Sequence, residues 1–139
     1  MSRHPSRGGT LVEFALAWPL VLLSVLATVE LSLWASESFA ARSAALAGAR
    51  AGSGAGGGPE VSAEVAIESL RPSLAGTRVA GWCPGDVRRP PPVWVCAQDA
   101  GTRIEVEIGG NVPAVVPLLP ARAGLPLHAR ASVPKEMFT

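Results

Sequence analysis

The sequence predicts an α+β protein with a long N-terminal helix that crosses a membrane, a second short helix and a small antiparallel β-sheet. Residues 11–35 contain no Lys or Arg and are mostly apolar. Several segments after residue 78 alternate apolar and polar residues, which is typical of half-buried strands. With 139 residues, the chain is long enough for an anchor and one small domain, but not for two globular domains.

The first element is a membrane helix. Residues 11–35 would be about 37 Å long at ~1.5 Å per residue, which exceeds a hydrocarbon core of ~30 Å. Arg3 and Arg7 precede this segment, and the next cation is Arg42. This charge distribution places the N-terminus in the cytoplasm and the remainder of the chain outside. Pro19 predicts a kink or a local loosening inside the span.

A cleaved secretory signal is the alternative for this segment. The basic start fits, and small-residue cleavage sites are conceivable near Ala35 or Ala40. The apolar region of such a signal is normally about 7–15 residues long and carries no acid. The longer apolar stretch and Glu13 therefore favour a retained anchor.

A processing signal surrounds the start of the apolar stretch, whose residues 7–14 read RGGTLVEF. It resembles a prepilin-type signal, in which a short basic leader ends in Gly and a Glu stands at the fifth mature position. Cleavage between Gly8 and Gly9 would make Glu13 the fifth mature residue and Phe14 the sixth. Cleavage one residue later would place Glu13 at position four, so the first site is preferred.

The continuation, VEFALAWPLVLLSVLATVEL, resembles the TadE/TadF-like pseudopilins of the tight adherence (Flp) pilus. The shared features are Val-Glu-Phe-Ala, a Pro six residues after the Glu, a Leu-rich run and a second Val-Glu. The segment AARSAALAGARAG is also similar, as is, more loosely, the tail VVPLLPARAGLPLHARASVPKE. The resemblance is strong over residues 7–52, weak over 59–111 and suggestive over 112–136. It implies a pilin-like fold and a minor pseudopilin that acts in assembly initiation or in a tip complex.

The resemblance also implies an organisation and a set of partners. Residues 1–8 would be the leader, 9–52 the transmembrane and stalk helix, and 53–139 an extracytoplasmic head. The protein would be a single-pass protein of the bacterial inner membrane, with a periplasmic or extracellular head, and a component of the pilus fibre or tip. Its partners would be prepilin peptidase, the assembly platform and other pilins or pseudopilins in a hetero-oligomer.

Glu13 has a physical role in this interpretation. Cleavage after Gly8 would expose the amine of Gly9 about one helical turn away, and a carboxylate in lipid is tolerated when it is paired. Pairing with the amine of a neighbouring subunit would set the register of a helical bundle. The alternative is that Glu13 lies at the headgroup level. Glu30 is expected to be solvated near the outer interface, although a packing role stays open.

The segment after the membrane continues in helical composition with a face of mostly small residues, which lets helices approach closely. The residues expected on this face are Phe39, Ala40, Ser43, Ala44, Ala47 and Ala51. Gly52, Gly54 and Gly57 then match the dinucleotide pattern G-x-G-x-x-G. That pattern requires a preceding strand, whereas here a helix precedes it, so we interpret this stretch as a flexible hinge.

The second helix is predicted to begin at Pro59, because proline is favourable at a first helical position. Its expected buried residues, continuing just beyond the helix, are Val61, Ala63, Ala66, Ile67, Leu70 and Leu74. Glu60, Glu64 and Glu68 follow one another at a spacing of four. Because no His is nearby, a solvated helix edge is preferred to a metal site.

Two cysteines stand near the facing ends of two predicted strands, RVAGWC and VWVCAQ, which flank a Pro-rich loop. In an exported domain Cys83 and Cys96 would most simply form a disulfide. A loop of this size would stabilise the fold by roughly 3 kcal/mol in the chain-entropy model. A metal pair or a redox-active pair is the alternative, but C-x-x-C spacing and a third nearby ligand are absent from the sequence.

The remaining strands alternate clearly. In TRIEVEIGG the residues Ile104, Val106 and Ile108 are expected to point inward, after a turn at Asp99 to Gly101. NVPAVVPLLPARAG contains too many prolines for a central strand and is expected to pack as an apolar arm. In LPLHARASV one face carries Leu125, Leu127, Ala129, Ala131 and Val133. His128 falls on the other, polar face and is expected to be solvated.

The sequence lacks the signs of an enzyme. The histidines are His4 and His128, and no nucleophile motif, phosphate loop or metal spacing occurs, so no cofactor or metal is expected. A net charge of +1 with no basic run argues against nucleic-acid binding. Two alternatives stay open. One is a minor pseudopilin of type II secretion, which more often has Phe where this chain has Gly9. The other is a membrane-anchored periplasmic binding domain unrelated to pili.

Overall fold

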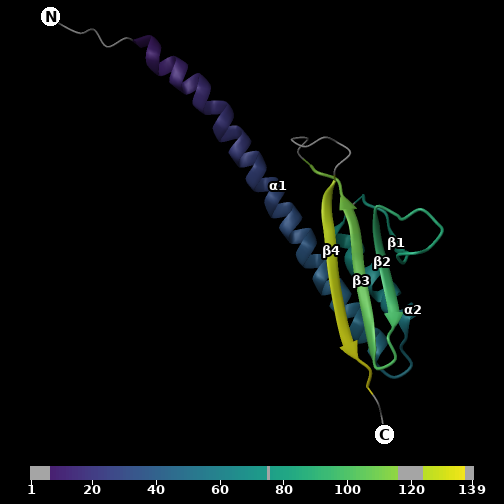
Figure 1. The fold of residues 1–139 in the computed structure, drawn as a ribbon. Coiled ribbons are helices and arrows are strands. Elements are labelled where there is room, and N and C mark those ends of the chain that lie inside the picture. Colours follow the sequence, from purple (N-terminus) through teal and green to yellow (C-terminus); the bar gives the residue numbers. More distant parts are fainter. Residues whose placement is uncertain (1–6, 75, 116–123, 137–139) are drawn as a thin grey trace, which may run out of the picture.

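A single long helix, α1 (Arg7–Ser53), projects from a head formed by the rest of the chain and by its own C-terminal part (Figure 1). The structure, a computed structural model, describes residues 7–74, 76–115 and 124–136. The other elements are α2 (Pro59–Leu70), the 3₁₀ helix η1 (Arg71–Ser73), β1 (Val79–Gly81), β2 (Val93–Asp99), β3 (Arg103–Val112) and β4 (Leu125–Pro134). The predicted α+β class, with a long apolar N-terminal helix, a short second helix and a small sheet, is confirmed. Leader residues 1–6, His4 included, and residues 116–123 of the apolar arm lie outside the described residues.

The sheet is mixed, which corrects the prediction of a purely antiparallel one. The strand order is β1-β2-β3-β4, and the β2–β3 and β3–β4 pairs are antiparallel. β1 instead runs parallel to β2, with Val79 opposite Val93 and Gly81 opposite Val95. Between them the chain contains Pro84 and Pro90–Pro92. Prolines have no N–H to donate to the ladder of a hairpin. The segment therefore forms a loop that brings the chain back, so that β2 begins beside the first residue of β1 and runs in the same direction.

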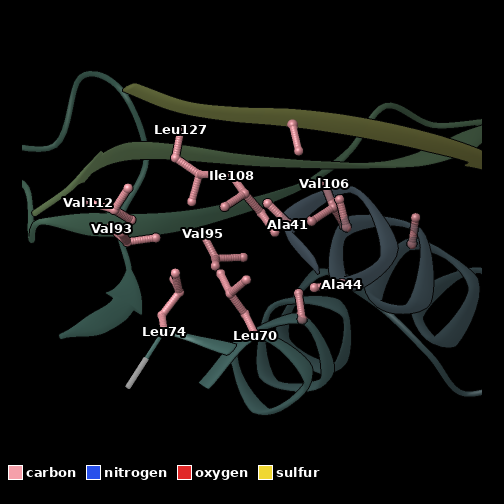
Figure 2. Close-up of a cluster of buried hydrophobic side chains, with 14 of the residues drawn as sticks. Ala41, Ala44, Leu70, Leu74, Val93, Val95, Val106, Ile108, Val112 and Leu127 are labelled. Atoms are coloured by element: carbon pink, nitrogen blue, oxygen red, sulfur yellow. The ribbon is translucent and has the colours of Figure 1, made fainter. Parts of the chain in front are cut away.

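The helices cover one face of the sheet. α1 packs against β3 and β4, and α2 packs against β2 and β1. Figure 2 shows Leu70, Leu74 and two alanines of α1 facing the inward side chains of the strands. Ile104, Val106 and Ile108 of β3 are buried, as predicted. On the predicted apolar face of β4, Leu127 and Ala129 are buried, whereas Leu125, Ala131 and Val133 are half-buried and pack against the core.

The packed face of α1 differs from the predicted one. The buried residues are Ala41, Ala44, Ala45, Gly48, Ala49, Gly52 and Ser53. Phe39 is instead 75% exposed, and Ser43 is also exposed. Small residues occupy nearly every position here, so their spacing alone does not define a face. Arg42, Leu46 and Arg50 are exposed and lie four residues apart, which marks the outward side.

The predicted buried face of α2 also needs a correction at one position. Ala66, Leu70 and Leu74 are buried as predicted, but Val61 is 39% exposed and Ser62 is fully buried. A Cβ at Gly48 would lie 2.5 Å from the Ser62 carbonyl oxygen, and a Cβ at Gly52 would overlap the Ser62 hydroxyl. The two helices therefore approach so closely that only a small residue fits at position 62, and its hydroxyl donates to the Gly58 carbonyl oxygen (2.9 Å).

The glycine-rich connection is a defined turn rather than the predicted flexible hinge. The Gly57 N–H donates to the Gly54 carbonyl oxygen (3.0 Å), and Gly56 has a φ of 77°. A Cβ at Gly57 would lie 2.6 Å from the Gly52 carbonyl oxygen. Glycine is thus required here by close backbone approach and a left-handed conformation, and the turn places α2 directly against α1.

On the outward face of the sheet, polar side chains of β3 and β4 contact one another across the strands. Arg130 pairs with Glu105 at 2.6 Å, and His128 lies 3.0 Å from Glu107. His128 is exposed on the polar face, as predicted, although Glu107 contacts it. The predicted turn after β2 is confirmed, because the Asp99 carboxylate accepts from the Gly101 N–H at 2.8 Å.

Candidate functional site

The N-terminal part of α1 stands clear of the head (Figure 1). We call residues 11–29 the free half of α1. Its exposed large apolar side chains are Leu11, Val12, Phe14, Leu16, Trp18, Leu20, Val21, Leu22, Leu23, Val25 and Val29. Since residues 20–23 include four in succession, they cover every side of the helix. A helix that is apolar all round is suited to lipid rather than to water.

The length of the free half matches a bilayer. At ~1.5 Å per residue it extends about 28 Å, close to a hydrocarbon core of ~30 Å. Within the described residues, α1 is the helix that is long and apolar enough to cross a membrane. It is continuous through Pro19.

The hydroxyl side chains in the free half and just beyond it are satisfied within the helix. The hydroxyls of Ser24, Thr28 and Ser32 donate to the carbonyl oxygens of Leu20, Ser24 and Thr28, each at 2.8 Å. A hydroxyl that bonds to its own helix needs no water and is tolerated in hydrocarbon. These three residues are therefore no obstacle to membrane insertion.

The four residues of the predicted processing and assembly motif all lie in the first turns of α1. Gly8 and Gly9 are helical, and Glu13 and Phe14 are exposed. The Phe14 ring stacks on that of Trp18, with centroids 6.4 Å apart. Gly9 and Glu13 are four residues apart, so they lie one turn apart on the same side of the helix. Cleavage before Gly9 stays a prediction.

The head begins to contact α1 at Glu30, so the packing role that the sequence left open applies rather than the preferred solvated carboxylate. Both Glu30 carboxylate oxygens accept from the backbone N–H of Val115, each at 3.1 Å. One turn later, the Trp34 indole N–H donates to the Pro126 carbonyl oxygen at 3.0 Å. These bonds hold both ends of the β3–β4 connection on the helix. Tryptophan is also enriched at membrane interfaces.

Sequence reasoning did not find this junction as a site. The signal in the chain was the second Val-Glu followed by a Trp four residues later, which places both polar groups on one face of the helix. Their partners lie 85 and 92 residues away along the chain. The four-residue spacing of Glu30 and Trp34 could therefore indicate that they share one face of α1, but not which residues bind to that face.

Comparison with known families supports this view of α1. The model of the TadE-like protein family matches residues 8–50. The chain is TadE-like over this segment. No curated protein and no solved structure matches the chain.

The TadE-like segment contains all four motif residues and both junction residues of α1. It also includes most of the small residues that pack under the head, from Ala41 to Ala49. α2, the sheet and the disulfide lie beyond the matched residues. The matched part thus combines a membrane-length helix with the face on which the head is built.

The predicted disulfide between Cys83 and Cys96 is present. Their Cα atoms are 4.8 Å apart, and 13 positions separate them in the sequence. Cys83 follows the edge strand β1, and Cys96 lies in β2. The bond therefore fixes the start of the Pro-rich loop to the sheet.

The acidic row on α2 offers no binding geometry. Glu60, Glu64 and Glu68 are all exposed, as expected for a solvated helix edge. Over residues 7–74, 76–115 and 124–136, no three or more His, Cys, Asp or Glu residues come together in a group that could hold a metal ion.

Proposed function

We propose that the protein is a minor pseudopilin of tight adherence pilus biogenesis and acts in assembly initiation or in a tip complex. The observation that carries this proposal is the free half of α1. It is a bilayer-length helix, apolar on every side, that ends where the head begins at Glu30. The TadE-like match over the same helix supports it.

The proposed orientation places the N-terminus in the cytoplasm and the head in the periplasm. Arg3 and Arg7 precede the free half, and no Lys or Arg follows until Arg42. Positive residues next to a span favour its cytoplasmic end. The disulfide agrees with this orientation, because such bonds persist in the oxidising periplasm.

Glu13 is proposed to set the register between neighbouring subunits. It is the one charged residue of the free half and is exposed there, and a carboxylate in hydrocarbon costs roughly 3 kcal/mol on insertion scales. After cleavage by prepilin peptidase, the Gly9 amine of an adjacent subunit would supply the opposite charge. The partners of the assembled subunit would be other pseudopilins and the assembly platform.

The first test determines the mature N-terminus. Intact mass and N-terminal sequencing of the protein from a host with active prepilin peptidase should show a chain that begins at Gly9. A chain that begins at Met1 or Ser2, or beyond Ala35, would contradict the proposal.

The second test replaces Glu13. Glu13→Ala should insert into the membrane at least as well as the wild type, because a costly charge is removed. Crosslinking to sister pseudopilins should fall strongly at matched membrane levels, and Glu13→Asp should be intermediate. Glu68→Ala removes a carboxylate from the exposed edge of α2 and should leave crosslinking unchanged. Equal crosslinking of Glu13→Ala and wild type would reject the register role.

A further inference from the structure

The loop between β1 and β2, residues 82–92, is held in one conformation by several independent bonds. The disulfide joins Cys83 to Cys96 of β2, and the Trp82 N–H donates to the Val95 carbonyl oxygen at 3.1 Å. The Trp82 indole N–H also donates to the Arg88 carbonyl oxygen at 2.8 Å. The loop projects from the side of the head away from β4 (Figure 1). It is thus a rigid feature that contributes little to the core.

Glycines of β3 make room for this region. A Cβ at Gly109 would overlap the ring of Trp94, and a Cβ at Gly110 would overlap the Pro92 carbonyl oxygen. Gly110 also has a φ of 138°. Trp94 in turn contacts Trp82 edge-on, with ring centroids 5.5 Å apart. The sheet is shaped so that an aromatic pair and the Pro-rich segment lie close against it.

The loop and the edge of the sheet form a concavity of about 330 Å³, which we call the cationic recess. Its lining includes Arg78, Trp82, Arg88, Arg89 and Pro90–Pro92, and no acidic residue. Arg88 pairs with Asp86 at 3.0 Å. Among the described residues, Arg78 and Arg89 have no carboxylate within ion-pair distance, so two guanidinium groups are available to a ligand.

We propose that the cationic recess binds an acidic polysaccharide. The guanidinium groups of Arg78 and Arg89 would pair with the carboxylates of uronate residues, since guanidinium and carboxylate match in a bidentate geometry. Trp82 and the prolines provide apolar surface for the sugar rings. An acidic peptide is a poorer fit, because Pro90–Pro92 lack the N–H donors that a peptide main chain would use. This inference goes beyond the proposed function and does not depend on it.

The test measures binding of the full-length protein, in neutral detergent micelles, to immobilised polygalacturonate at physiological salt. Dextran controls for neutral sugars, and poly-L-glutamate controls for charge without sugar. The double variant Arg78→Gln/Arg89→Gln is compared with Arg50→Gln/Arg71→Gln, which removes the same charge from exposed positions on α1 and η1. All four arginines are exposed, and near-ultraviolet circular dichroism checks that each variant is folded.

The proposal expects the wild type to bind polygalacturonate but not dextran. The recess variant should bind about tenfold more weakly or worse, the equivalent of one lost charge-assisted contact, whereas the control variant should keep its affinity. Absence of binding, equal binding to poly-L-glutamate, or an equal loss in the control variant would overturn it.

Discussion

The free half of α1 and its packed half, residues 34–53, belong to one helix but differ in the size of their side chains. The free half exposes Leu, Val, Phe and Trp on every side, whereas the packed half buries only Ala and Gly, with Ser53 at its end. Lipid accommodates large apolar side chains in any arrangement. Two helices and a sheet that meet at close distance accept only small ones. Apolar character therefore places both halves out of water, and side-chain size decides whether the partner is lipid or protein.

The largest expected effect comes from the disulfide, which only the head possesses. The variant Cys83→Ser/Cys96→Ser should lower the free energy of unfolding of the head by about 3 kcal/mol, because the open chain gains conformational freedom. Urea denaturation in detergent, followed by near-ultraviolet circular dichroism, measures this loss. Membrane insertion by the free half should be unchanged. Loss of insertion would show that the two regions do not behave independently.

The next effect tests side-chain size in the packed half. Gly48→Ala should destabilise the head by about 2 kcal/mol, because the new Cβ would lie 2.5 Å from the Ser62 carbonyl oxygen and 2.9 Å from the Ala66 Cβ. The sign of this change in stability is informative, because Gly→Ala at an exposed helix position instead stabilises by about 1 kcal/mol.

The matched control for Gly48→Ala is Gly54→Ala. A Cβ at Gly54 would meet nothing closer than the Ala51 carbonyl oxygen at 3.9 Å, so the stability of the head should change little. Thermal unfolding of both variants beside the wild type compares them directly. A stabilising Gly48→Ala would contradict the close approach of α1 and α2.

Sequence reasoning predicted the elements whose signal is local. Ile104, Val106 and Ile108 alternate with charged residues and are buried as expected, and the turn at Asp99 formed as predicted. Sequence reasoning did not identify the packed face of α1. Ala and Gly occupy almost every position there, so their spacing does not indicate which side of the helix is buried. The exposed Arg42 and Arg50, eight residues apart, were the available marker.

The features that sequence reasoning missed depend on contacts between distant residues. Glu30 and Trp34 bind backbone atoms of Val115 and Pro126. Every residue type has a backbone carbonyl, and nearly all have an N–H, so the identity of the partner residue does not reveal such a bond. The parallel pairing of β1 with β2 depends on the path of the chain between them rather than on either strand. The glycine-rich stretch looked flexible by composition, although close packing requires its glycines.

The junction between the two halves should show a smaller effect. Trp34→Phe keeps the ring but removes the indole N–H that donates to the Pro126 carbonyl oxygen, which should cost about 1 kcal/mol of head stability. Trp18→Phe makes the same change in the free half and should leave the head unaffected. Hydrogen exchange of the backbone amides at the start of β4 should accelerate in Trp34→Phe alone. Equal exchange rates of these amides in Trp34→Phe and Trp18→Phe would show that the head does not begin at the Trp34 contact.

The smallest effect is expected at the end of the head that lies beside the C-terminus of α1, away from its free half. Lys135 pairs with Asp99 at 2.6 Å, the Lys135 N–H donates to the Thr102 carbonyl oxygen, and the Glu136 N–H donates to the Ser53 carbonyl oxygen. The hydrogen bond from the Lys135 ammonium, followed by that from the Gly101 N–H, lowers the pKa of Asp99 below its ordinary value of 3.8. The ionised carboxylate is therefore the form that the folded head favours.

A carboxyl group with a lowered pKa in the folded state stabilises the fold above its unfolded pKa, and this stabilisation is lost as pH falls through the folded pKa. Asp99→Asn keeps an oxygen that can accept from the Gly101 N–H but removes the charge that faces Lys135. The wild type should be slightly more stable than Asp99→Asn at pH 7, and the difference should shrink below about pH 4. Because the pair is exposed, added salt should also reduce the difference at pH 7. Denaturation curves of both proteins from pH 7 to pH 3 measure it, and a difference independent of pH would assign the role of Asp99 to the turn alone.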